Sequence, residues 1–161
     1  MGFSDFFGSG SRKPEPDVIA VSPQELWQRL MRLNSAAAPW RVRQGTSEEG
    51  VDLVAEWRTG DPRWQPIFDE ININESFMIL MRLDPEKSEL RAKDQMWEWR
   101  RDDNNRFRQI RVDSSGNLQV TASGTVNGYD YRFDTNDMKN PLRDTATASG
   151  WTYKGLLYRS V

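Results

Sequence analysis

The spacing of apolar residues has a helical period near the start of the chain and again near its end. Apolar side chains recur at helical spacing over residues 26–33, with arginines on the other side. The serine, proline and glutamate within residues 22–25 occupy the positions that a helix start prefers. Residues 135–149 carry a second stripe, and Gly150 follows it where a left-handed cap belongs. Two amphipathic helices are therefore predicted, each with an apolar face to bury.

Between these helices apolar residues alternate with polar ones, which is typical of half-buried β-strands. Residues 40–44 and 51–58 flank a turn and predict a hairpin, and residues 77–83 are apolar on both faces, as in a central strand. The other strand-like segments span 89–100, 106–112, 118–126 and 129–133, with a last candidate at 151–158. The predicted fold is α+β: one antiparallel meander sheet of six or seven strands, partly curled, packed with an N-terminal and a C-terminal helix.

The length of 161 residues fits one compact domain. Residues 1–17 combine a Gly-Ser repeat with prolines and charges, so they are predicted to be a flexible tail before a single domain at 18–161. Phe3, Phe6 and Phe7 of this tail are candidates for contact with a membrane or a partner. No apolar run is long enough for a membrane helix, and a soluble cytoplasmic protein is expected.

Histidine and cysteine are both absent, which excludes several classes of function. Ser-His-Asp triads, Cys-His pairs and cysteine-ligated zinc or iron–sulfur sites all need one of these residues. The net charge of −2 excludes a basic coat for nucleic acid and disfavours nucleic acid as a partner. No phosphate-binding glycine loop is present, and no catalytic residue, cofactor or metal site is assigned. Seven tryptophans predict a core built around aromatic side chains.

The strand predicted at 89–100 carries two carboxylates on a mostly apolar face. With a period of two, Asp94 and Glu98 fall on one face together with three apolar residues. Buried carboxylates are candidates for acid–base catalysis by a hydrolase or isomerase. Their attachment points lie roughly 13 Å apart, which is long for a pair that acts on one bond. The competing interpretation is that a neighbour such as Arg82 neutralises each of them.

The opposite face of the same segment combines aromatic and basic residues. Trp97 and Trp99 lie beside Arg91, Lys93 and several arginines between residues 100 and 111. Aromatic rings among cations on a sheet are typical of proteins that bind single-stranded nucleic acid, because the bases stack on the rings. The competing interpretation is that long arginine side chains cover the tryptophan rings.

A curved sheet closed by two helices also has room for a small apolar ligand. Trp57 and Arg82 are the candidate ligand-binding residues of such a cavity, with Phe77, Met81 and Met96 as further lining. A cavity of this kind would be enclosed between the sheet and the helices. The same residues are typical of a filled core, which is the competing interpretation.

Three stretches combine tryptophans and turn residues in a recognisable pattern. They are VAEW at 54–57 followed by Trp64, MRLDP at 81–85 leading to RAKD at 91–94, and Pro141-Leu142 leading to SGWTYKG at 149–155. Together they resemble a bacterial domain family of unknown function that is frequent in actinobacteria, and the likeness spans most of residues 40–157. The resemblance implies a bacterial domain and carries no activity, cofactor or site residue.

These observations predict a non-enzymatic binding or interaction domain that acts on a protein partner, a lipid surface or a small apolar ligand. Its candidate binding residues are Trp57, Arg82, Trp97 and Trp99. The first alternative is a carboxylate-dependent hydrolase or isomerase that uses Asp94 or Glu98. The second is a protein that binds single-stranded nucleic acid through Trp97, Trp99 and the neighbouring arginines.

Overall fold

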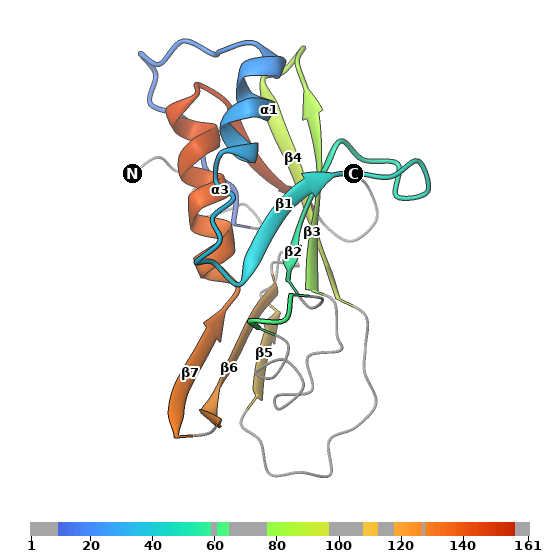
Figure 1. The fold of residues 1–161 in the computed structure, drawn as a ribbon. Coiled ribbons are helices and arrows are strands. Elements are labelled where there is room, and N and C mark those ends of the chain that lie inside the picture. The colour runs from blue at the N-terminus through green and yellow to red at the C-terminus, as the bar shows by residue number, and fades with distance from the viewer. Residues whose placement is uncertain are drawn as a thin grey trace.

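The computed structural model describes residues 10–58, 61–64, 77–96, 108–112, 118–126 and 128–156. Within these residues the chain has an α+β fold with two sheets (Figure 1). The larger sheet is mixed, mostly antiparallel and open. Its strands, in spatial order, are β1 (Trp40–Gln44), β2 (Leu53–Trp57), β3 (Phe77–Asp84), β4 (Glu89–Met96) and β8 (Thr152–Leu156). The smaller sheet consists of β5 (Arg108–Val112), β6 (Leu118–Val126) and β7 (Tyr129–Asp134).

The helices α1 (Pro23–Met31) and α3 (Asn136–Ala148) pack on one face of the larger sheet, and the smaller sheet extends from its lower end (Figure 1). The predicted start of α1 is confirmed, because Ser22 Oγ accepts a hydrogen bond from the Glu25 N–H at 3.2 Å. The second helix also forms where the apolar stripe predicts it. Among the residues that the structure describes, neither helix has the length and apolarity needed to cross a membrane.

The division into two sheets differs from the single meander of six or seven strands that the sequence predicts. β5, β6 and β7 pair with one another and form a sheet of their own. β8 joins the larger sheet and runs parallel to β4, with Tyr153 opposite Leu90. The helix α3 lies between β7 and β8 in the chain. A long connection of this kind allows β8 to run parallel to its neighbour in the sheet, which a hairpin turn does not allow.

The core lies between the larger sheet and the two helices. The inward positions of β2 and β3 are filled with apolar side chains, and α1 adds Leu26 and Leu30. The prediction of a tryptophan-rich core is confirmed for Trp40, Trp57 and Trp151, which are each less than 10 % exposed. Trp57 also packs edge-to-face on Phe133 of β7, with ring centroids 5.4 Å apart. This contact links the two sheets.

Both outer strands of the larger sheet receive hydrogen bonds from outside the sheet. The Asn34 side chain accepts from the Val42 N–H at 2.7 Å and donates to its carbonyl at 2.8 Å. On β8, Arg12 and Tyr153 exchange two backbone hydrogen bonds of 2.8 and 2.9 Å. Arg12, part of the segment predicted to be a tail, therefore pairs with the sheet, while residues 1–9 lie outside the described residues. Covered edges protect a sheet from pairing with other chains.

Candidate functional site

An open pocket of about 690 Å³ lies where α1 meets the ends of the first three strands. In Figure 1 this region is at the top, where α1 stands beside the turn between β3 and β4. The lining residues come from three separate parts of the chain: Pro23, Gln24, Trp27 and Gln28 of α1; Gln44, Gly45, Val51 and Asp52 around the β1–β2 turn; and Leu83 and Pro85 at the end of β3.

Backbone hydrogen bonds hold the strand ends that form one wall of the pocket. The Gly45 N–H donates to the Asp52 carbonyl at 2.9 Å, and the Asp52 N–H donates to the Met81 carbonyl at 3.0 Å. The Leu83 N–H donates to Asp52 Oδ2 at 2.8 Å, which fixes the carboxylate beside the pocket. A Cβ atom at position 45 would lie 2.1 Å from the Val51 carbonyl oxygen, so only glycine permits this close approach.

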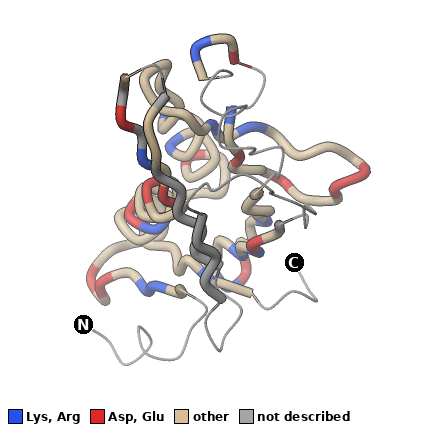
Figure 2. Tube along the Cα trace, turned by 90° about the horizontal axis from the view of Figure 1, so that it is seen from below, with Lys and Arg blue, Asp and Glu red and all other residues tan. Residues whose placement is uncertain are grey.

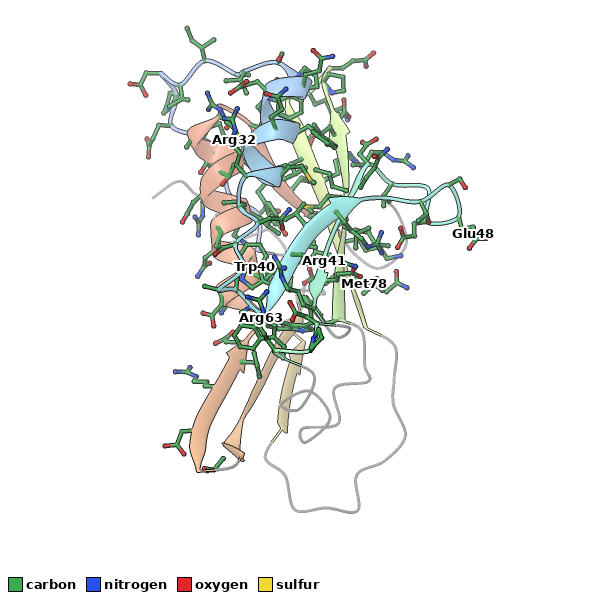
Figure 3. All side chains as sticks on the ribbon, in the orientation of Figure 1. Arg32, Trp40, Arg41, Glu48, Arg63 and Met78 are labelled. Carbon is green, nitrogen blue, oxygen red and sulfur yellow. The ribbon has the colours of Figure 1, made fainter. Side chains whose placement is uncertain are left out.

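The turn between β1 and β2 is held by a network of charged side chains. Arg43 donates to both carboxylate oxygens of Glu49, at 2.9 and 2.7 Å, and also to Glu56 at 2.7 Å. The hydrogen bonds from Arg43 lower the pKa of Glu49 to about 2. Glu48 points away from this network at the outer end of the turn (Figure 3). The turn therefore forms a fixed wall, which reduces the ordering that a ligand must impose.

The pocket lining combines an apolar surface with hydrogen-bonding groups. Trp27 is half-buried and stands among the apolar side chains of two prolines, Val51 and Leu83. Three glutamine amides and the carboxylate of Asp52 supply the polar groups. Asp52 is the single charged residue among the described residues of this lining. The chemistry fits a molecule with an apolar body that donates hydrogen bonds or carries a positive charge.

The structure does not bring the predicted binding residues Trp57 and Arg82 together. Trp57 lies in the core, on the face of the sheet toward the helices. Arg82 is exposed on the opposite face and donates a hydrogen bond to the Gly50 carbonyl. The other two predicted binding residues, Trp97 and Trp99, lie outside the described residues.

Sequence reasoning missed the pocket because it assigned its residues to other roles. Trp27 belongs to the apolar stripe over residues 26–33, and such a stripe predicts a face buried in the core. Pro23 and Pro85 are typical of a helix start and a turn. The pattern along the chain does not show that these segments meet in space.

Asp94, the candidate catalytic carboxylate, lies on the inner face of β4, as the alternation predicts. It forms a salt bridge with Lys139 of α3, whose side chain is 1 % exposed. Lys139 Nζ also lies 5.6 Å from the centre of the Phe77 ring. The partner of Asp94 is therefore a lysine on a distant helix rather than Arg82. Glu98, the second candidate, lies outside the described residues.

A second buried pair lies beside this salt bridge. The Arg143 guanidinium lies 5.5 Å from the centre of the Tyr153 ring. Burial raises the pKa of the Tyr153 hydroxyl well above its usual value of 10.0, and the Asp94 carboxylate raises it further, while Arg143 lowers it. The larger sheet and α3 are thus joined by two cations, a carboxylate and a neutral phenol.

The raised pKa of Tyr153 makes stability depend on pH in the alkaline range. Below about pH 10 the Tyr153 hydroxyl is protonated in both the folded and the unfolded state. Above it, the unfolded chain loses this proton while the folded protein keeps it, so the free energy of unfolding falls by about 1.4 kcal/mol per pH unit. Urea denaturation between about pH 9 and about pH 11 measures this change. The free energy of unfolding should decline less for Tyr153→Phe than for the parent protein. Equal declines would contradict the expectation.

Comparison of the chain with protein-family models, with curated proteins and with solved structures finds no match. The resemblance to an actinobacterial domain family stays a prediction.

Proposed function

We propose that the protein is a non-enzymatic binding domain whose pocket between α1 and the ends of β1–β3 takes a small, partly apolar ligand. The observation that carries this proposal is the pocket itself. Its volume of about 690 Å³ falls in the range that small-molecule sites occupy. Trp27 offers an aromatic surface, and the glutamines and Asp52 offer hydrogen bonds that orient a bound molecule.

The charge of the lining narrows the class of ligand. Asp52 contributes a negative charge, and none of the described lining residues is a lysine or an arginine. An anionic ligand would meet repulsion without a compensating cation. A molecule with an uncharged donor group or an ammonium group would instead gain a charge-assisted hydrogen bond to Asp52 and a contact with the Trp27 ring.

The lining also favours binding over catalysis. Acid–base chemistry normally needs two titratable groups with different proton affinities at the reacting bond. In the part of the lining that the structure describes, Asp52 is the one titratable residue. Asp94, the described candidate for catalysis, is held in the salt bridge with Lys139 under α3. Structural pairing of this kind supports a role for Asp94 in holding the helix on the sheet.

The pocket can be blocked by one substitution on α1. Gln28→Trp places a large side chain over the pocket, and we expect it to weaken the binding of pocket ligands at least about tenfold, or about 1.4 kcal/mol. The assay follows the indole N–H resonance of Trp27, assigned with Trp27→Phe, against a fragment library grouped by charge. Uncharged and cationic fragments should shift this resonance more often than anionic fragments do.

Arg32→Trp is the matched control for the blocked pocket. Arg32 lies at the C-terminal cap of the same helix, is exposed and does not line the pocket (Figure 3). Fragments that bind in the pocket should still bind to this variant. The proposal is wrong if no fragment perturbs Trp27, or if both tryptophan variants lose the same fragments to the same degree.

A further inference from the structure

Three cationic side chains stand next to one another on the face of the larger sheet that points away from the helices. Arg82 of β3 lies directly opposite Arg91 of β4, and Arg91 lies directly opposite Lys154 of β8. We call these three residues the cation row. Neighbouring strands are about 4.8 Å apart, so the row spans about 10 Å between its outer attachment points. Lys93 follows on the same face of β4.

The three charges of the cation row stand side by side without a carboxylate partner within 4.0 Å in the described part of the chain. In the described part of the chain, neither the row nor Lys93 forms a salt bridge, although most described arginines do. Described arginines with a carboxylate within 4.0 Å include Arg12, Arg29, Arg32, Arg41, Arg43, Arg63 and Arg132. Like charges directly opposite each other destabilise a sheet, and Arg82–Arg91 and Arg91–Lys154 are both such pairs.

Two carboxylates near the row accept hydrogen bonds from backbone N–H groups rather than from the row. Asp52 accepts a hydrogen bond from the Leu83 N–H. Asp84 Oδ1 accepts from two N–H groups of the β3–β4 turn, at 3.1 and 3.3 Å. The single contact that the structure gives for the row is the hydrogen bond from Arg82 to the Gly50 carbonyl, and this contact leaves its charge uncompensated. An anion placed over the row would remove the repulsion among its members.

We propose that the cation row is a binding site for a compact, soluble polyphosphate. Two guanidinium groups and an ammonium group extend from neighbouring positions of three adjacent strands and carry several N–H donors. Guanidinium matches the oxygens of phosphate in paired hydrogen bonds. Asp84 and Glu89 stand opposite each other on the same face, two residues nearer the turn. They limit the positive surface on that side, so a partner must fit within the row.

The carboxylates of Asp84 and Glu89 beside the cation row disfavour the binding of larger polyanions. The phosphates of a nucleic-acid strand or of an anionic bilayer extend over much more than about 10 Å. Either partner would therefore bring negative charge against these carboxylates. Among the described residues, positive and negative ones are interspersed rather than gathered in one basic region (Figure 2). The site is also independent of the pocket, whose lining contains a carboxylate and no cation.

The test uses inorganic tripolyphosphate and the full chain. Isothermal titration should show binding that weakens as the salt concentration rises. Arg91→Gln removes the middle of the row, and we expect at least a tenfold loss of affinity. Lys87→Gln is the matched control, because Lys87 is an exposed cation of the β3–β4 turn that lies outside the row. Its affinity should stay within about twofold of the parent.

The folded state of each variant is checked without ligand. Because Arg91→Gln removes two like-charge contacts, its melting temperature should equal or exceed that of the parent, so a loss of binding cannot be ascribed to unfolding. The proposal is overturned if tripolyphosphate does not bind, or if Arg91→Gln and Lys87→Gln weaken binding equally. It is also overturned if a single-stranded oligonucleotide or vesicles with anionic lipid bind through Arg91 more tightly than tripolyphosphate does.

Discussion

Replacement of Lys139 by methionine should reduce the free energy of unfolding by about 3–5 kcal/mol. Lys139 and Asp94 are both removed from water, with side chains 1 % and 9 % exposed. Without the ammonium group, the Asp94 carboxylate stays buried and loses this compensating charge. Methionine keeps most of the side-chain volume and can still pack against the Phe77 ring. Urea denaturation followed by circular dichroism measures the change.

The double variant Lys139→Met with Asp94→Asn separates charge from packing. Its carboxylate is gone as well, so we expect it to recover a large part of the stability that Lys139→Met loses. Asp94→Asn alone should be destabilised, because it leaves the lysine charge buried without this carboxylate. A loss below about 1 kcal/mol for Lys139→Met, within the range of an exposed pair, would show that the salt bridge does not hold α3 on the sheet.

Gly150→Ala should reduce the free energy of unfolding by about 2–4 kcal/mol, from strain and overpacking together. Gly150 has a φ of +77°, a left-handed conformation that costs little only for glycine. A Cβ atom there would lie 2.6 Å from backbone atoms of Ile19 and Ala20. The segment before α1 would then have to move, and with it the hydrogen bond from the Trp151 indole to the Val21 carbonyl at 2.8 Å.

Gly50→Ala is the control for backbone strain alone. Gly50 has a φ of +66°, and a Cβ atom at this position meets nothing within 4 Å. It should therefore show the conformational penalty, about 1 kcal/mol, without the clash. Thermal denaturation of both variants measures the difference. Equal losses would mean that the close approach of Ile19 and Ala20 to Gly150 does not contribute to stability.

Local features of the fold could be predicted from the sequence because they depend on neighbours in the chain. The cap at Ser22 acts over three residues, and the alternation in β4 puts Asp94 on the inner face whatever the strand pairs with. The tryptophans Trp57 and Trp151 are buried as the composition indicates. Each of these predictions depends on the local spacing of apolar residues or on a single helix cap. None of them requires knowledge of segments that are distant in the chain.

The pairing of distant segments could not be predicted in this way. Nothing in the alternation of β8 shows that it joins β4, or that β5–β7 form their own sheet. Lys139 and Arg143 were not expected in the interior, because charged residues on a helix are usually exposed. The pocket and the cation row each combine residues from three parts of the chain. The predictions for Glu98, Trp97 and Trp99 lie outside the described residues and stay predictions.

The parallel pairing of β8 with β4 has a consequence for the order of folding. β1 to β4 pair as successive neighbours in the chain, so their contacts close short loops. Leu90 and Tyr153 stand opposite each other, although the whole smaller sheet and α3 separate them in the chain. Long loops close at a greater entropic cost. We therefore expect the outer side of β4 to stay an open edge during synthesis until β8 has been made, and β8 to complete the sheet last.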